Sequence, residues 1–240
     1  MSSVLPSVSE KPRYVAAMFG RIARRYDAMN TLMTLGQDAR WRRIVARALD
    51  GLAPSGRVLD VGTGTGRLAC AVLERHAGTR VVGVDFTLPM LERAPRTLRL
   101  AAADALTLPF DDAQFDAVVS GFVVRNLADL ERGLAEQARV LRPGGLLAIL
   151  ETTPGPSVWP ASVVYRLYFR QLVPFVGGVI ARDAAAYTYL PESTLRFTAP
   201  DRLADLLRRQ GLVEVRIQRF ALGCVAMTMG RKPGYASRQE

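Results

Sequence analysis

The sequence predicts an α/β fold, a Rossmann-like, doubly wound and mostly parallel seven-stranded sheet with a terminal antiparallel hairpin and an N-terminal helical cap. Short apolar runs alternate with helical patterns from residue 57 to residue 210, which is typical of a parallel sheet with helices on both faces. A glycine-rich turn follows the first apolar run, as at the ligand-binding edge of such sheets. Two final strand-like runs are joined by a short turn, so they form a hairpin.

Hydrophobic periodicity places the expected elements along the chain. Helical spacing extends from Tyr14 to Ala48 and is broken at Gly36, which predicts at least two helices before the sheet. Strands are expected at 58–61, 81–85, 99–102, 117–121, 146–150, 212–220 and 224–230. Further helices are expected at 67–75, 88–93, 134–141 and 200–210. The polar segments 1–12 and 231–240 are expected to be disordered.

One stretch, Trp159 to Ile180, departs from the alternation because it is apolar and aromatic and carries Arg166 and Arg170. One interpretation is a capping helix packed on the sheet edge. The other is a wall and entrance for a large apolar substrate, in contact with a bilayer through aromatic and arginine side chains. The two are compatible. The chain therefore divides into an N-terminal helical cap over the ligand-binding edge of the sheet (1–50) and a domain built on the sheet (51–240) with an apolar, substrate-side insertion (153–198).

Composition limits the classes of function. The 240 residues are 49% apolar and carry a net charge of +10, which suits one well-buried domain. Lysine occurs only at Lys11 and Lys232, and the arginines are scattered. This pattern favours genome composition and an anionic membrane surface over nucleic acid. Two distant cysteines, Cys70 and Cys224, predict a reducing compartment. With no signal-like segment or membrane-spanning run, we expect a cytoplasmic protein with peripheral contact to the inner face of the membrane.

The glycine-rich turn is the most informative stretch. Its residues are Asp60, Val61, Gly62, Thr63, Gly64, Thr65 and Gly66, with the glycines at alternate positions. Glycine permits a positive φ and lets a ligand approach where a Cβ would clash. A dinucleotide-binding turn would have its third glycine at the position of Arg67. An NAD site is therefore the weaker alternative.

Carboxylates at or just after the ends of successive predicted strands indicate the ligand. Asp60 lies where a dinucleotide would bring its phosphates, so it favours a cationic ligand. Asp85 can hold the two hydroxyls of a ribose, and Asp104 can accept a hydrogen bond from an adenine amino group. The combination suits S-adenosylmethionine (SAM), which has a sulfonium, an ammonium, a ribose and an adenine but no phosphate.

Four further stretches narrow the family. They are Met18–Asn30, which contains Tyr-Asp-Ala-Met-Asn; Phe122–Asn126; Arg139–Gly145 together with Glu151; and Asp183–Ser193. With the glycine-rich turn, they resemble the UbiE-type C-methyltransferases of menaquinone and ubiquinone biosynthesis, a family of class I SAM-dependent methyltransferases. The resemblance covers nearly the whole chain, and the Tyr-Asp-x-Met-Asn stretch is its most specific part.

The resemblance implies methylation of a ring carbon of a polyprenylated quinol, such as demethylmenaquinol, which is a membrane lipid. By matching positions, it implies that Arg125 and Asn126 face the quinol ring and that Tyr26 closes over the site. The predicted cofactor-binding set is Asp60, Gly62, Thr63, Gly64, Thr65, Gly66, Asp85, Phe86, Asp104, Ala105 and Gly121. The chain departs from the family at Val123, where glycine is usual, and at 34–39. Val123 is expected to narrow the pocket floor.

Methylation of a quinol ring carbon requires a cation to stabilise the quinol oxyanion and a group that carries away the ring proton. Arg125 could stabilise the quinol oxyanion, and water or Tyr26 would relay the ring proton. Two structural alternatives stay open: an ion pair of Arg125 with Asp129, and a core position for Tyr26 in a lid helix. His76, the only histidine, is expected to be solvated at a helix end. No metal site is predicted, because one histidine without a Cys-x-x-Cys pair cannot form a zinc site.

Two other classes of function remain open from the sequence. A methyltransferase of a soluble small molecule would share the cofactor residues but would not need an apolar segment at 159–180. A non-catalytic SAM-binding scaffold would bind the cofactor without turnover. A homodimer is a further open expectation.

Overall fold

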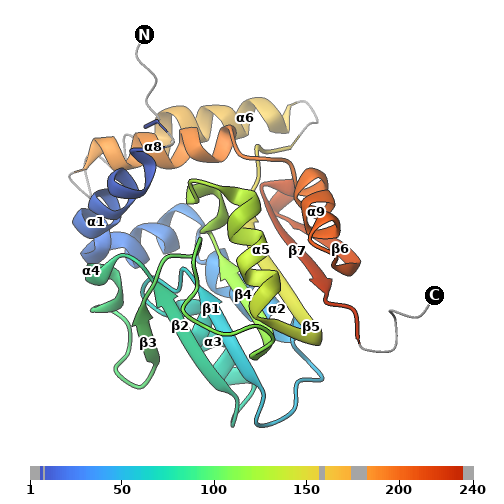
Figure 1. The fold of residues 1–240 in the computed structure, drawn as a ribbon. Coiled ribbons are helices and arrows are strands. Elements are labelled where there is room, and N and C mark those ends of the chain that lie inside the picture. The colour runs from blue at the N-terminus through green and yellow to red at the C-terminus, as the bar shows by residue number, and fades with distance from the viewer. Residues whose placement is uncertain (1–5, 8, 157–159, 174–182, 235–240) are drawn as a thin grey trace.

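The computed structural model describes residues 6–7, 9–156, 160–173 and 183–234. Its centre is one seven-stranded sheet with the strand order β3-β2-β1-β4-β5-β7-β6 (Figure 1). Neighbouring strands are parallel from β3 to β5, and β7 is antiparallel to both β5 and β6. The predicted fold class, including the terminal hairpin, is confirmed. The strands are β1 (Arg57–Val61), β2 (Arg80–Asp85), β3 (Arg99–Ala102), β4 (Phe115–Gly121), β5 (Leu141–Thr152), β6 (Val213–Phe220) and β7 (Val225–Arg231).

The main difference from the predicted boundaries lies at the start of β5. The sequence pattern placed the end of a helix at 141 and the strand at 146–150, whereas helix α5 (Leu130–Val140) ends one residue earlier and β5 begins at once. Leu141 pairs with Phe115, and the register then shifts before Ala117 pairs with Leu146. The Pro-Gly-Gly segment is accommodated as an irregularity of the strand, which is where such residues occur in sheets.

Helices cover both faces of the sheet. On one face, α2 (Gln37–Ala48) and α3 (Arg67–Arg75) share a buried cluster with strand residues such as Val58 and Ala117. On the other face, α5 and α9 (Pro200–Arg209) pack on residues such as Leu59 and Leu147. Figure 1 shows α5 and α2 on opposite sides of the sheet. The strands between them are almost continuously apolar because both of their faces are buried.

A third layer lies over the carboxyl edge of the sheet. It contains α1 (Lys11–Met33), α4 (Leu88–Leu91), η1 (Val124–Asn126) and α8 (Ala184–Leu195). Apolar side chains of α1, α4 and α8 form a separate buried cluster. The segment 1–50 therefore divides at Gly36, because α1 joins this layer whereas α2 covers a sheet face. Helix α1 begins at Lys11, inside the segment expected to be disordered.

The apolar insertion contributes α6 (Ala161–Leu167) and η2 (Tyr168–Leu172), and α6 runs beside α8 across the top of Figure 1. Residues 157–159 and 174–182 of this segment lie outside the described residues. The Tyr165 hydroxyl donates to the Thr153 carbonyl at 2.8 Å, and the Tyr168 hydroxyl donates to the Met33 carbonyl at 2.6 Å. The described part thus packs as a cap. No helix in the described ranges has both the length and the apolar character needed to cross a membrane.

The core of β5 gives a test of this packing. Leu147 of β5 is fully buried on the face of the sheet that α5 and α9 cover. Leu147→Ala should therefore lower the free energy of unfolding by about 2–5 kcal/mol. Leu222 lies in the turn η4 (Ala221–Gly223), has φ of 56° and is 83% exposed. The matched Leu222→Ala should change stability by less than about 0.5 kcal/mol. Denaturant unfolding measures both, and equal losses would contradict this core assignment.

Candidate functional site

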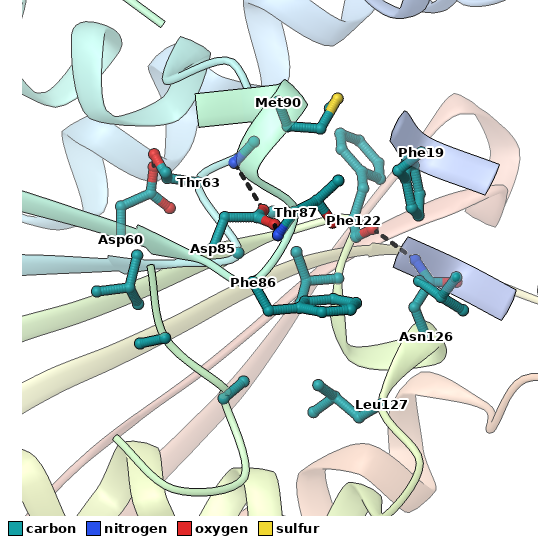
Figure 2. Close-up of a pocket in the computed structure, with 18 of the residues that line it drawn as sticks. Phe19, Asp60, Thr63, Asp85, Phe86, Thr87, Met90, Phe122, Asn126 and Leu127 are labelled. Carbon is teal, nitrogen blue, oxygen red and sulfur yellow. Dashed lines mark hydrogen bonds between the residues drawn. The ribbon is translucent and has the colours of Figure 1, made fainter. Parts of the chain in front are cut away.

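A pocket opens at the carboxyl edge of the sheet, beneath α1 and α4. It holds about 1110 Å³ of empty space, including its open mouth, which suits a ligand of cofactor size. Every predicted site residue lines this pocket except Gly66 and Arg125. The lining members are Tyr26, Asp60, Gly62, Thr63, Gly64, Thr65, Asp85, Phe86, Asp104, Ala105, Gly121 and Asn126. Figure 2 shows residues from β1, β2, α1 and the segment that follows β4 converging on this space.

Gly62 and Gly66, in the turn after β1, each have a positive φ and a close neighbouring side chain. Gly62 has φ of 67°, and a Cβ there would lie 2.2 Å from a methyl group of Val123. Gly66 has φ of 80°, and its Cβ would lie 2.4 Å from Leu98. Glycine is therefore required at both positions, by conformation and by close packing. Gly66 serves the junction between the turn and α3 and does not line the pocket. Val123 lines the pocket and packs against the turn.

Asp60 is the most deeply buried acid of the site. Its Oδ2 accepts hydrogen bonds from the Thr63 hydroxyl at 2.7 Å and from the Ala69 amide at 3.1 Å. Its Oδ1 is buried and accepts none from the described residues. Burial raises the pKa of Asp60 to about 7, although these hydrogen bonds and Arg42 act in the opposite direction. An unsatisfied buried carboxylate oxygen beside a pocket calls for a hydrogen-bonding or cationic partner.

Asp85 ends β2 and is held by the backbone. It accepts from the Gly64 amide at 3.0 Å and from the Thr87 amide at 2.8 Å, so both oxygens are fixed while lone pairs stay free for a ligand. Burial raises the pKa of Asp85 above its usual value. Asp104, which is exposed, accepts from the Leu106 amide at 2.9 Å. In Figure 2, Asp85 lies between Asp60 and the residues that follow β4.

The segment after β4 brings Asn126 to the pocket. Phe122 takes a φ of 63°, an uncommon conformation for an aromatic residue, and its carbonyl faces back toward η1. The Asn126 amide donates to this carbonyl at 3.4 Å, as Figure 2 shows, and the Tyr189 hydroxyl donates to Asn126 Oδ1 at 3.3 Å. The Asn126 side chain is thus held from two sides.

Arg125 lies behind the pocket wall. Its guanidinium forms a buried ion pair with Glu151 and donates to the Phe122 carbonyl at 2.9 Å. Burial acts to lower the pKa of Arg125, but Glu151, Tyr26 and Tyr189 together raise it above its usual value. The alternative pairing with Asp129 is wrong, because Asp129 caps α5 by accepting from the Arg132 amide at 3.0 Å. The structure places Arg125 outside the pocket lining, and its catalytic role stays a prediction.

Tyr26 lines the pocket from α1 and is half-buried. Its ring meets the Phe19 ring edge-on, with centroids 5.5 Å apart, at the margin of the cap cluster. Tyr26 therefore both packs within the cap and lines the pocket. The adjacent Asp27 accepts from the Thr65 hydroxyl at 2.9 Å, which ties α1 to the glycine-rich turn.

Several lining residues were not predicted. Phe19, Met90, Phe122 and Leu127 form the apolar part of the wall, and Arg42 and Arg67 contribute positive charge. Arg67 had a visible signal, because it replaces the third glycine of a dinucleotide turn. The aromatic residues carry no such signal, since the sequence gives them the pattern of core residues. No described residue of 160–173 lines the pocket.

These residues fit SAM. A buried carboxylate oxygen without a partner suits an ammonium, the Asp85 carboxylate suits two ribose hydroxyls, and the apolar wall suits an adenine or another flat ring. His76 lies elsewhere, with Nε2 2.8 Å from the Ala46 carbonyl. In the described part of the chain, no three His, Cys, Asp or Glu side chains gather in a way that could hold a metal ion.

Comparisons with known proteins agree with this fit. The sequence model of the ubiE/COQ5 methyltransferase family matches residues 7–232. A demethylmenaquinone methyltransferase of Thermus thermophilus is 44% identical over 223 residues, covering 90% of this chain and 100% of the relative. One from Deinococcus radiodurans is 44% identical over 231 residues, covering 93% and 94%. The ubiquinone/menaquinone biosynthesis C-methyltransferase UbiE of Desulfotalea psychrophila is 43% identical, covering 91% and 90%.

Solved structures are similar in fold. A SAM-dependent methyltransferase from Thermotoga maritima matches with a TM-score of 0.67 at 20% identity, covering 90% of this chain and 98% of that one. Phosphoethanolamine N-methyltransferase 2 of Haemonchus contortus, solved with S-adenosyl-L-methionine, matches with a TM-score of 0.57 at 16% identity, covering 80% and 52%.

The raised pKa of Asp60 predicts a pH dependence. The group titrates near 7 in the folded chain and near 4 when unfolded, so the folded chain binds more protons between these values and loses stability as pH rises through them. In the ligand-free protein, the free energy of unfolding of the wild type should fall relative to Asp60→Asn between about pH 5 and about pH 8. Denaturant titrations of both proteins at both pH values measure this. If the free energy of unfolding changes equally with pH in the wild type and in Asp60→Asn, the prediction is refuted.

The pairing of Arg125 predicts a stability difference. Glu151→Ala would leave a buried guanidinium without its counter-charge and should lower the free energy of unfolding by about 3–5 kcal/mol. Asp129→Ala removes only a helix cap and should cost about 1 kcal/mol. Exchanging both Arg125 and Glu151 for Met should recover most of the loss. If Glu151→Ala costs no more than Asp129→Ala in denaturant unfolding, the ion pair is not what holds Arg125.

Proposed function

This chain belongs to the ubiE/COQ5 methyltransferase family, and from that membership we propose that it methylates a ring carbon of demethylmenaquinol to give menaquinol. It is a SAM-dependent methyltransferase by family and fold. The observation that carries the substrate is the 44% identity across the whole length of the demethylmenaquinone methyltransferase of T. thermophilus. The pocket supports it, because an acidic cofactor end and an apolar wall share one cavity.

Each of the cofactor-binding acids would bind a different part of SAM. We assign the ribose hydroxyls to Asp85, the adenine amino group to Asp104 with Ala105 beneath the ring, and the ammonium to Asp60. SAM, when bound, supplies a methyl group on a positively charged sulfur. Binding both reactants in one cavity removes much of the entropic cost of bringing them together, which is worth roughly 7–11 kcal/mol in favourable cases.

The residues after β4 would act on the quinol. A ring carbon becomes a good nucleophile when an adjacent hydroxyl loses its proton, and Asn126 lies in the wall where its amide can donate to that oxygen. Arg125 supports this from behind, because it donates to the same Phe122 carbonyl as Asn126. The ring carbon gains the methyl group and then loses its own proton, which water or the Tyr26 hydroxyl would carry away.

The substrate is a lipid, so we propose that the chain works in the cytoplasm, in peripheral contact with the inner face of the membrane. The net charge of +10 favours an anionic surface. Val163 and Leu167, four residues apart on α6, are 40% and 50% exposed, which gives this cap helix an apolar outer face. A homodimer stays a prediction, which the mass of the protein in solution would test.

A methyl-transfer assay tests the function. Labelled methyl from SAM should enter demethylmenaquinol in detergent. Asp85→Asn should raise KM for SAM about tenfold or more, because a charged acceptor of the ribose is lost. Asn126→Ala should lower kcat about 10²-fold. Asp112→Asn, at an exposed acid outside the pocket, is the matched control and should behave as the wild type.

Two outcomes would replace the proposal. Label entering a water-soluble acceptor, with the same rate with and without lipid or detergent, would make the chain a small-molecule methyltransferase. Tight SAM binding with no label in any quinol would make it a non-catalytic cofactor-binding protein.

A further inference from the structure

Two arginines at one end of the pocket share a single buried carboxylate. Arg42 and Arg67 both line the pocket. Both donate to Oδ2 of Asp38, which is 1% exposed, and the Arg67 bond measures 2.8 Å. Among the described residues, Asp38 is the acid within ion-pair distance of both arginines, so this set of three side chains carries one positive charge in excess. Arg42 also attracts Asp60, which the proposed function assigns to the ammonium of the cofactor.

The pair is held in place by neighbouring elements. The Arg42 guanidinium lies over the Phe122 ring, 5.4 Å from its centre, at the end of β4. Arg67 opens α3 and also donates to the Thr31 hydroxyl at 3.2 Å. Asp38 accepts from the Thr34 hydroxyl at 3.2 Å. The side chains are thus fixed before a ligand arrives, which lowers the cost of binding.

The strand order places this pair at a defined end of the pocket. Asp104 and Ala105 follow β3, Asp85 ends β2, Asp60 belongs to β1, and Phe122 follows β4, and the sheet has the order β3-β2-β1-β4. If the adenine and ribose lie at β3 and β2, the amino-acid end of the cofactor lies at β1 and β4. That end carries an ammonium and a carboxylate, and Asp60 accounts for the ammonium alone.

We propose that Arg42 and Arg67, charged in excess of Asp38, bind the α-carboxylate of the cofactor. The site then recognises the amino-acid end as a zwitterion, with Asp60 opposite the ammonium and the two arginines opposite the carboxylate. Charge-assisted bonds of this kind are the strong ones in partly buried sites. The inference rests on SAM as the ligand of the proposed function, but it concerns affinity and not turnover.

The test compares two ligands that differ only in the carboxylate. The probes are SAM and decarboxylated SAM, titrated into the full chain by calorimetry. The wild type should bind SAM at least about tenfold more tightly. Arg67→Met should reduce this preference about tenfold by weakening SAM alone, because one charged bond is lost. Arg67 is the residue to change, since its side chain is 29% exposed whereas Arg42 is buried.

Arg75→Met is the matched control. It removes the same side chain from the far end of α3, where Arg75 pairs with Asp50, and it should leave both affinities unchanged. If Arg67→Met weakens both ligands equally, or if the wild type binds SAM without preference, the carboxylate site is refuted while the proposed function stands. A wild type that binds neither ligand overturns the proposed function as well.

Discussion

The architecture of the site depends on one buried carboxylate at the end of β1. Asp60 receives the Thr63 hydroxyl from the turn and the Ala69 amide from α3, so a single side chain joins strand, turn and helix. The positive φ angles of the glycines let the chain make this connection in five residues. The cost of burying the charge appears as its raised pKa. The same group that organises the turn therefore leaves an oxygen ready for a cation.

Around this centre, buried and partly buried charged side chains form two sets. The Arg125–Glu151 pair is balanced and lies behind the wall, so it contributes order more than net charge. The set of Arg42, Arg67 and Asp38 is unbalanced and lies at the wall itself. Isolated buried charges are unfavourable. A set of side chains whose charges cancel is therefore expected to serve the fold, whereas a set with an excess charge indicates where a ligand of opposite charge binds.

Much of this could be predicted from the sequence. The alternating apolar runs determine the sheet, and the positions of Asp60, Asp85 and Asp104 relative to the strand ends place them at one edge of any parallel sheet. The family resemblance added Tyr26 and Asn126, which local patterns could not single out. These contacts depend on strand ends and on short motifs, which sequence reasoning reads well.

Other contacts were beyond such reasoning. Glu151 lies 26 residues beyond Arg125 and meets it only because β5 lies beside β4, whereas Asp129 was the nearer acid in the chain. Phe19 and Met90 look like core residues and become pocket walls through the packing of α1 on α4. The sequence of the apolar insertion suits either a cap or a wall. Its described part packs as a cap, because the hydroxyls of Tyr165 and Tyr168 donate to backbone carbonyls beneath it.

The position of β7 has a consequence for how the molecule forms. This strand lies between β5 and β6. Its residue Gly230 pairs with Leu147 of β5, and the chain between these two residues makes up most of its second half. Closing so long a loop is slow, because its entropy must be lost before the pairing stabilises it. During synthesis, which proceeds from the N-terminus, β5 would carry an open edge until β7 leaves the ribosome. The pocket lies at the other strands, so its walls can be assembled before the sheet is closed.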